Sequence, residues 1–206
     1  MWSSRKKIFD ELNLHYPKDI EFLPVKDPYV FLVTVILSGS STDKMAIKSA
    51  DKLFAKNSSP SYIASLSEEE IEACIHSSGL SRAKAHNIKY ASMYIAENGI
   101  PDTLEELVKL PGVGEKTASC YIATILKRPA VIADTHFVRV ARRLGFTDTD
   151  DRAKAVKEIK SYVPEEYWTR LSMTVNLHGR VVCKAKCNCE SCFISSLCPS
   201  KGLCSR

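Results

Sequence analysis

Hydrophobic residues recur at helical spacing along nearly the whole chain, and the alternation typical of strands is almost absent. Ile8, Leu12 and Tyr16 mark an amphipathic N-terminal helix, whereas residues 29–37 are almost wholly apolar and predict a central, buried helix. The same pattern predicts a long helix that follows a turn at residues 79–82 and runs to about residue 98. It predicts further helices over residues 43–54, 67–77, 103–109, 115–126, 135–144, 151–162 and 165–177. The sequence therefore predicts an all-α fold.

Several of these helices have recognisable end signals. Thr42 or Asp43 is placed to cap the helix over 43–54, and residues 67–70 form a capping-box pattern. Gly99 ends the long helix, and Gly145 is suited to a left-handed cap after residue 144.

The tail from Cys183 onward has no helical pattern and is expected to be irregular. Six of the eight cysteines lie in the 22 residues from Cys183 to Cys204. No export signal precedes them, so clustering of this kind indicates a metal site in a reducing compartment. Cys74 and Cys120 stand alone within helical patterns and are expected to be small buried side chains.

Charge is unevenly distributed along the 206 residues, which are enough for one sizeable core or two small domains. Residues 1–128 carry 16 basic and 16 acidic side chains, and residues 129–206 carry 13 and 8, so the net charge of +5 arises in the last third. This excess suits a polyanionic partner, although a solvated basic surface would look the same. No apolar run approaches the roughly 18 residues of a membrane span, and we expect a cytoplasmic protein.

Residues 110–118, Leu-Pro-Gly-Val-Gly-Glu-Lys-Thr-Ala, form a glycine hairpin that leads directly into a helix. The glycines allow a tight turn and close approach to a large ligand, and the free amides of the following helix can bind a phosphate. Lys116 falls in the first turn, where the helix dipole disfavours its charge and leaves more neutral amine available as a nucleophile. A solvated or phosphate-binding lysine is the simpler alternative.

Three features occur here in one order: the hairpin with Lys116, the segment Asp134-Thr135-His136 eighteen residues further on, and His178-Gly179-Arg180 before the cysteine run. Together they resemble the endonuclease III family of helix-hairpin-helix DNA glycosylases with apurinic lyase activity. The resemblance extends from about Tyr29 to Cys198. It implies a central helical lobe over residues 20–128, a second lobe of 1–19 with 129–206, and a cleft between them.

The resemblance also assigns roles to residues. Lys116 would be the nucleophile that attacks C1′ of a flipped nucleotide and forms a Schiff base. Asp134 would be the catalytic aspartate, although its place before a helix already explains it as an N-cap. The two roles are compatible, because amide hydrogen bonds keep the carboxylate ionised. Further DNA contacts are implied at Gly112, Val113, Gly114, Thr117 and His136, of which His136 is more structural or phosphate-facing than a base.

Two loops are candidates for filling the gap left by the flipped base. Leu80 matches an apolar wedge of the family, although a core leucine at a helix start is an equal alternative. Ser40 stands where the family usually has a glutamine, and the shorter side chain cannot fill the same space. The range of lesions is therefore less certain than the type of reaction.

The cysteines at 183, 189, 192 and 198 are the expected ligands of a [4Fe–4S] cluster. The family has six residues between the first two ligands, whereas this chain has five. Cys183 is favoured because it follows His-Gly-Arg, and Cys187 is the alternative. Zinc is the rival metal, but only Cys189 and Cys192 form a Cys-x-x-Cys pair.

These features predict a monomeric, nucleoid-associated base-excision enzyme. It would remove damaged, in particular oxidised, pyrimidines from double-stranded DNA and cleave 3′ of the abasic site by β-elimination. A single-function mismatch or uracil glycosylase would use a water nucleophile, and such relatives lack a lysine at position 116. A non-catalytic hairpin module that binds DNA would need neither Lys116 nor Asp134. A plain iron–sulfur carrier is disfavoured by the long helical body, which shows no feature for a redox partner.

Overall fold

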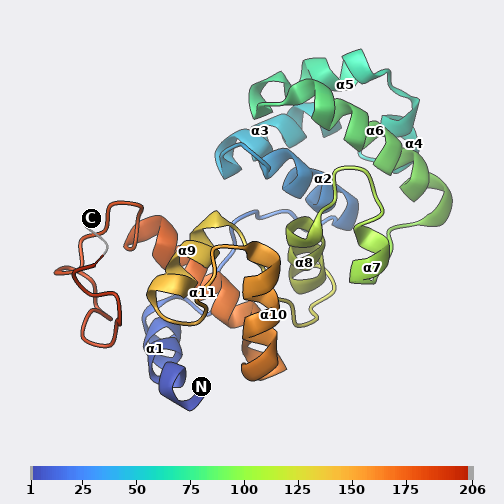
Figure 1. The fold of residues 1–206 in the computed structure, drawn as a ribbon. Coiled ribbons are helices and arrows are strands. Elements are labelled where there is room, and N and C mark those ends of the chain that lie inside the picture. The colour runs from blue at the N-terminus through green and yellow to red at the C-terminus, as the bar shows by residue number, and fades with distance from the viewer. Residues whose placement is uncertain (1, 204–206) are drawn as a thin grey trace. The chain divides into compact units, whose positions relative to one another are not determined.

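The computed structural model describes residues 2–203. Within them the chain forms eleven α-helices and two short 3₁₀ helices, and no strand (Figure 1). The all-α prediction is confirmed. The chain divides into two compact units, one of residues 21–128 and the other of residues 1–20 with 129–206.

The unit of residues 21–128 contains seven α-helices and one 3₁₀ helix: α2 (Pro28–Ser38), α3 (Asp43–Phe54), α4 (Pro60–Ser65), α5 (Glu68–Ile75), η1 (His76–Ser78), α6 (Ser81–Asn98), α7 (Leu104–Leu107) and α8 (Glu115–Thr124). Helix α2 is central, as its apolar sequence predicts, and packs against α3, α6 and α8. All its residues from Phe31 to Leu37 are buried.

The caps in this unit follow the sequence signals closely. Thr42 accepts a hydrogen bond from the amide of Met45 at the start of α3, and Ser67 and Glu70 complete the predicted capping box of α5. Helix α4 was missed, although Ser59 caps it and Pro60 occupies its first position. The helix expected over 67–77 ends at Ile75 and continues as η1.

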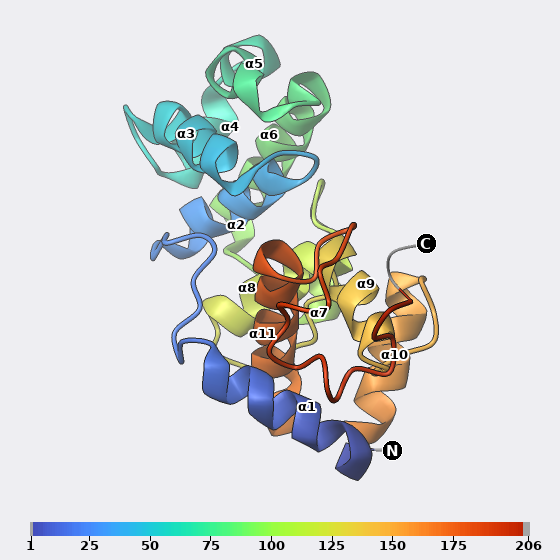
Figure 2. The ribbon, with the colours of Figure 1, turned by 90° about the vertical axis from the view of Figure 1, so that its left-hand side faces the viewer.

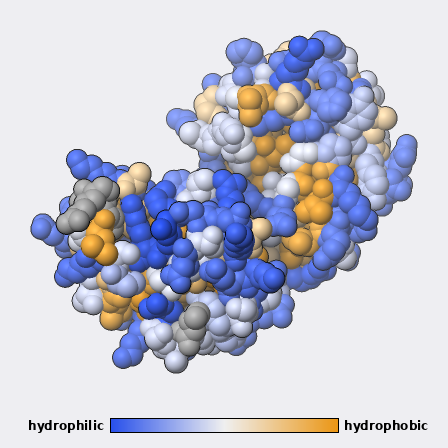
Figure 3. Space-filling view, viewed as in Figure 1, coloured by the Kyte–Doolittle hydropathy of each residue, from blue (hydrophilic) through white to orange (hydrophobic). Residues whose placement is uncertain are grey.

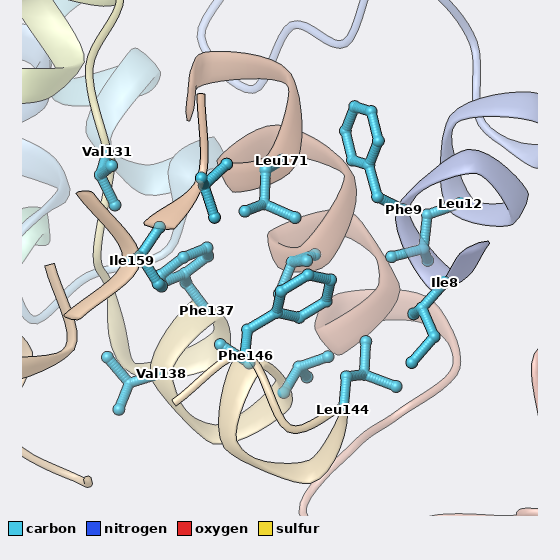
Figure 4. Close-up of a cluster of buried hydrophobic side chains, with 14 of the residues drawn as sticks. Ile8, Phe9, Leu12, Val131, Phe137, Val138, Leu144, Phe146, Ile159 and Leu171 are labelled. Atoms are coloured by element: carbon cyan, nitrogen blue, oxygen red, sulfur yellow. The ribbon is translucent and has the colours of Figure 1, made fainter. Parts of the chain in front are cut away.

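The unit of residues 1–20 with 129–206 contains α1 (Trp2–His15), α9 (Thr135–Arg143), α10 (Arg152–Tyr162), η2 (Glu165–Tyr167) and α11 (Trp168–Val181). Its core gathers around Phe137, Phe146 and Leu171, and α1 contributes Ile8 and Leu12 (Figure 4). Helix α11 packs against both α1 and α9.

One expectation for this unit needs correction. The helix predicted over 165–177 begins at Trp168, after the η2 turn, and continues to Val181. After it the chain is an irregular loop, as the lack of periodicity predicts (Figure 2). This loop is tied to the unit by Ile194, which is buried in the core, and by Phe193, whose ring stacks on His15 at 3.7 Å between centroids.

The surfaces are mixed in character. On the face seen in Figure 3, hydrophobic patches appear on the unit of residues 21–128, and smaller ones appear among hydrophilic residues on the unit of residues 1–20 with 129–206. Cys74 and Cys120 are half-buried, not fully buried as expected. Among the helices of residues 2–203, none combines the length and the apolar character that a membrane span requires.

Candidate active site and cysteine pocket

The glycine hairpin is a rigid turn between α7 and α8. Val113 is buried and its amide donates to the carbonyl of Leu110 at 3.0 Å, which closes the turn. Gly112 has a φ of +78°, and a Cβ there would lie 2.9 Å from Cβ of Asn87 on α6. Only glycine satisfies both the backbone and the packing at this position.

The start of α8 lacks a side-chain cap. Gly114 is its N-cap and has no side chain to satisfy the first-turn amides, and a Cβ there would meet nothing within 4 Å. The amides that follow therefore point outward from an open surface. Lys116 and Thr117 are half-buried in this turn, and Gly112 and Gly114 are exposed.

Lys116 lies in the first turn of α8. Among the described residues, none forms a hydrogen bond or ion pair with its amine. By contrast, the amine of Lys109, on the other side of the hairpin, forms an ion pair with Glu106. An amine without a carboxylate partner beside free amides can meet an electrophile on a phosphate-bearing ligand.

Asp134 caps α9, as predicted. Its Oδ1 accepts the amide of Phe137 at 2.7 Å, and the side chain is half-exposed. The preceding segment is fixed on α11, because Thr169 and Ser172 accept the amides of Ala130 and Ile132 at 3.1 and 3.0 Å. The carboxylate is thus held in one place while part of it still faces solvent.

His136 lies in the first turn of α9 and is half-buried. Its Nδ1 is 3.3 Å from a guanidinium nitrogen of Arg139, which also donates to the carbonyls of Gly179 and Cys183. A Cβ on Gly179 would lie 3.2 Å from that of His136, so α9 and α11 approach closely here. These contacts give His136 a structural role, and they leave its predicted contact with DNA untested.

The loops of Ser40 and Leu80 lie side by side in the unit of residues 21–128. A Cβ on Gly79 would be 3.2 Å from the carbonyl oxygen of Ser40. Ser40 and Leu80 both have a φ of +52°, which non-glycine residues rarely adopt, and Leu80 is 68% exposed. The alternative interpretation of Leu80 as a core residue is therefore wrong.

Sulfur atoms of the C-terminal loop surround one pocket. Cys183, Cys187, Cys189, Cys192 and Cys198 line it, together with apolar residues such as Leu144 and Val182. Within the described residues, no three His, Cys, Asp or Glu side chains are grouped closely enough for a single metal ion. The five sulfurs line one pocket, and those of Cys187 and Cys189 lie 3.5 Å apart.

Arginines of α9 hold the first cysteine in place. Arg143 donates to Sγ of Cys183 at 3.3 Å and to the carbonyls of Lys184 and Ala185, and Arg139 binds the carbonyl of Cys183 at 3.1 Å. Cys183 also donates its amide to the carbonyl of His178 at the end of α11. No sequence pattern indicates Arg143, because its role depends on the loop folding back onto α9.

Buried groups surround the other sulfurs. Burial raises the pKa of the Cys192 and Cys198 thiols, with further contributions from neighbouring cysteines. Burial also lowers the pKa of His178 to about 4, so its imidazole is neutral at pH 7. Its Nδ1 lies 2.8 Å from the hydroxyl of Tyr16, and its Nε2 lies 3.5 Å from Sγ of Cys192. Thiolates in such a place need a compensating positive charge, which a metal supplies.

Comparison with known proteins agrees with this geometry. Residues 33–165 match the sequence model of the HhH-GPD superfamily of base excision DNA repair proteins. The chain thus has both the fold and the hairpin of a DNA repair protein of this superfamily.

Individual relatives narrow the assignment. Endonuclease III of Thermotoga maritima is 35% identical over 84% of this chain and 83% of its own. That of Haemophilus influenzae is 34% identical over 97% and 96%. A solved endonuclease III in a trapped covalent intermediate with DNA superposes with a TM-score of 0.90 at 32% identity, covering 98% of this chain and 99% of that one. The chain belongs to the endonuclease III family.

Proposed function

We propose that this protein is a DNA glycosylase and apurinic/apyrimidinic lyase of base excision repair. The observation that carries the proposal is the unpaired amine of Lys116 in the first turn of α8, beside the open amides of the glycine hairpin. A phosphate clamp needs the amides but not this lysine. The relative trapped in a covalent intermediate with DNA supports a covalent path.

The reaction follows from the chemistry of an amine. Neutral Lys116 attacks C1′ of a nucleotide that has left the helix stack, the glycosidic bond breaks, and the base departs with the bonding electrons and a proton. Opening of the sugar ring gives an iminium between Lys116 and C1′. The iminium acidifies the C2′ proton, whose loss expels the 3′ phosphate, and water then releases the amine.

Asp134 supplies negative charge in this scheme. Its Oδ1 is held by the amide of Phe137, so the carboxylate is fixed in position before the substrate binds. A fixed carboxylate stabilises positive charge as it develops on the sugar without reorganising during the step. Oxidised pyrimidines are the proposed substrates, although Ser40, in the place of the usual glutamine, leaves more space beside the lesion.

We further propose that the cysteine pocket holds a [4Fe–4S] cluster through Cys183, Cys189, Cys192 and Cys198. Four ligands are required, and three of these four pack against the hydrophobic core: Cys183, Cys192 and Cys198. Cys187 lines the same pocket, with its sulfur 3.5 Å from that of Cys189. The cluster would fold a loop that has little hydrophobic core of its own.

Borohydride trapping on DNA that contains one abasic site tests the function. The native protein is expected to become covalently attached to the DNA, and Lys116→Gln is expected to abolish both trapping and strand cleavage while most DNA binding remains. Lys109→Gln is the matched control, because it removes a lysine from the other side of the same hairpin. Trapping that persists in Lys116→Gln would place the nucleophile elsewhere, and base release without trapping in the native protein would indicate a single-function glycosylase.

A further inference from the structure

Lys84 is a buried cation for which the proposed reaction has no use. It lies one turn into α6 and is only 6% exposed. Within the described residues it has no carboxylate partner, and burial lowers its pKa. Lysine is rarely buried without a partner, so its contacts need a specific explanation.

Those contacts join the loop of Ser40 to the loop of Leu80, the two candidate wedge loops. The Nζ atom donates to the carbonyl of Leu37 at 2.8 Å and to that of Ser78 at 2.6 Å. Leu37 lies at the end of α2, three residues before Ser40, and Ser78 ends η1, two residues before Leu80. One ammonium group therefore binds the chain immediately before each loop.

The loops need such a connection because their backbones are strained. Ser40, Gly79 and Leu80 all have positive φ values, and two of the three are not glycine. A conformation of this kind persists only where surrounding contacts enforce it. The carbonyl end of α2 also carries the negative end of a helix dipole, which favours a cation at this point.

We propose that Lys84 is a positioning residue that sets the spacing of the Ser40 and Leu80 loops, so that both can enter a DNA duplex at the lesion. The inference rests on the proposed function of this chain. It concerns only the opening of the duplex and not the chemistry of Lys116. Loss of Lys84 would therefore impair action on duplex lesions and spare action on a nucleotide that is already unstacked.

Helix α6 provides a matched control. Lys89 is half-buried on the same helix and also donates to two carbonyls, those of Ala64 and Leu66, at the end of α4. Neither of these two hydrogen bonds reaches the loop of Ser40 or that of Leu80. Lys84→Met and Lys89→Met thus remove the same kind of interaction from one helix, and only the first separates the loops from each other.

The test compares single-turnover rates on two DNA probes. One is a duplex with a single dihydrouracil, and the other is a single strand with one abasic site. Lys84→Met is expected to slow duplex cleavage by on the order of 10- to 100-fold, as small misplacements do, and to change the single-strand rate less than about twofold. Lys89→Met is expected to leave both rates near those of the native protein.

A double-mutant cycle adds a second readout. If Lys84 acts through the loop of Leu80, Leu80→Ala should slow duplex cleavage little further when Lys84 is already Met.

Equal duplex rates for Lys84→Met and Lys89→Met, or equal losses on both probes, would overturn the proposal. Should Lys84→Met not fold, Lys84→Gln takes its place, and failure of both to fold would make Lys84 a general structural residue. If the native protein cuts neither probe, the proposed function itself fails.

Discussion

Single residues in this chain often carry a structural and a chemical role at once. Asp134 is the clearest case, because an N-cap and a catalytic carboxylate call for the same side chain in the same place. Sequence reasoning cannot separate the two roles, since both predict an acidic residue directly before a helix. A substitution that changes charge but retains capping can separate them.

Asp134→Asn is expected to reduce cleavage of damaged DNA by roughly 10²- to 10³-fold, because it removes a preorganised charge from the site. The melting temperature should change little, since asparagine caps as well as aspartate does. Single-turnover kinetics and thermal unfolding are the two measurements.

Asp151→Asn is the control for Asp134→Asn. Asp151 caps α10 in the same way and accepts the amide of Lys154 at 2.8 Å. Both variants should melt alike and only Asp134→Asn should be slow. Native activity in Asp134→Asn would reduce Asp134 to a cap.

At the scale of elements, the hairpin contains two glycines that are needed for different reasons. Gly112 is required by a positive φ and by its closeness to Asn87, whereas Gly114 stands in open space with ordinary backbone angles. The sequence shows the two glycines as equivalent halves of one motif. Their different environments make separate predictions.

Gly112→Ala is expected to destabilise the unit by at least about 1–2 kcal/mol, since it forces a left-handed alanine against α6. Gly114→Ala should cost less than about 1 kcal/mol of stability but weaken DNA binding, because its methyl group covers the first-turn amides. Denaturant unfolding and affinity for abasic DNA measure these effects. Equal unfolding midpoints for the two variants would contradict the different structural requirements at Gly112 and Gly114.

The cysteine loop is the second element with a testable assignment. The purified protein should contain about four irons per chain and negligible zinc. Serine at Cys183, Cys189, Cys192 or Cys198 should each lower iron content or soluble yield, whereas Cys187→Ser should lower neither. Cys183 is favoured because Arg139, Arg143 and the end of α11 all fix it. Iron loss on changing Cys187 but not Cys183 would reverse the assignment.

At the scale of the whole molecule, charge predicts how the protein finds DNA. Residues 129–206 hold 13 basic and 8 acidic side chains, and the remaining residues are balanced. Arg143 and Arg139 are occupied with carbonyls of the cysteine loop, so part of this excess is structural. Exposed lysines of the cysteine loop, Lys184 and Lys186, remain for phosphate contacts.

Affinity for duplex DNA should fall steeply with salt through release of counterions. With six or more phosphate contacts, the loss between 50 and 200 mM salt would be about 10³-fold or greater. Lys116→Gln allows the measurement at equilibrium, because it binds without cutting. A flat response over this range would contradict binding through the hairpin amides and basic side chains.

Most helices of this protein could be predicted from the sequence because their signals are local. Capping by Thr42, Ser67, Asp134 and Asp151 depends on residues only three positions away, and the apolar run of α2 by itself indicates burial. The hairpin, the aspartate and the cysteine run were recognisable for the same reason. Helix α4 was missed because it is only six residues long, too short for periodicity to show.

Only the tertiary structure shows which distant segments of the chain pack against each other. Periodicity indicates that α1 has a buried face, but not that this face packs against α11 more than 150 residues later. In the same way, Lys84 looks like an ordinary helical lysine until two carbonyls from distant segments meet its ammonium group. Such contacts depend on the complementary shapes of elements far apart in the chain, and no short stretch of sequence contains that information.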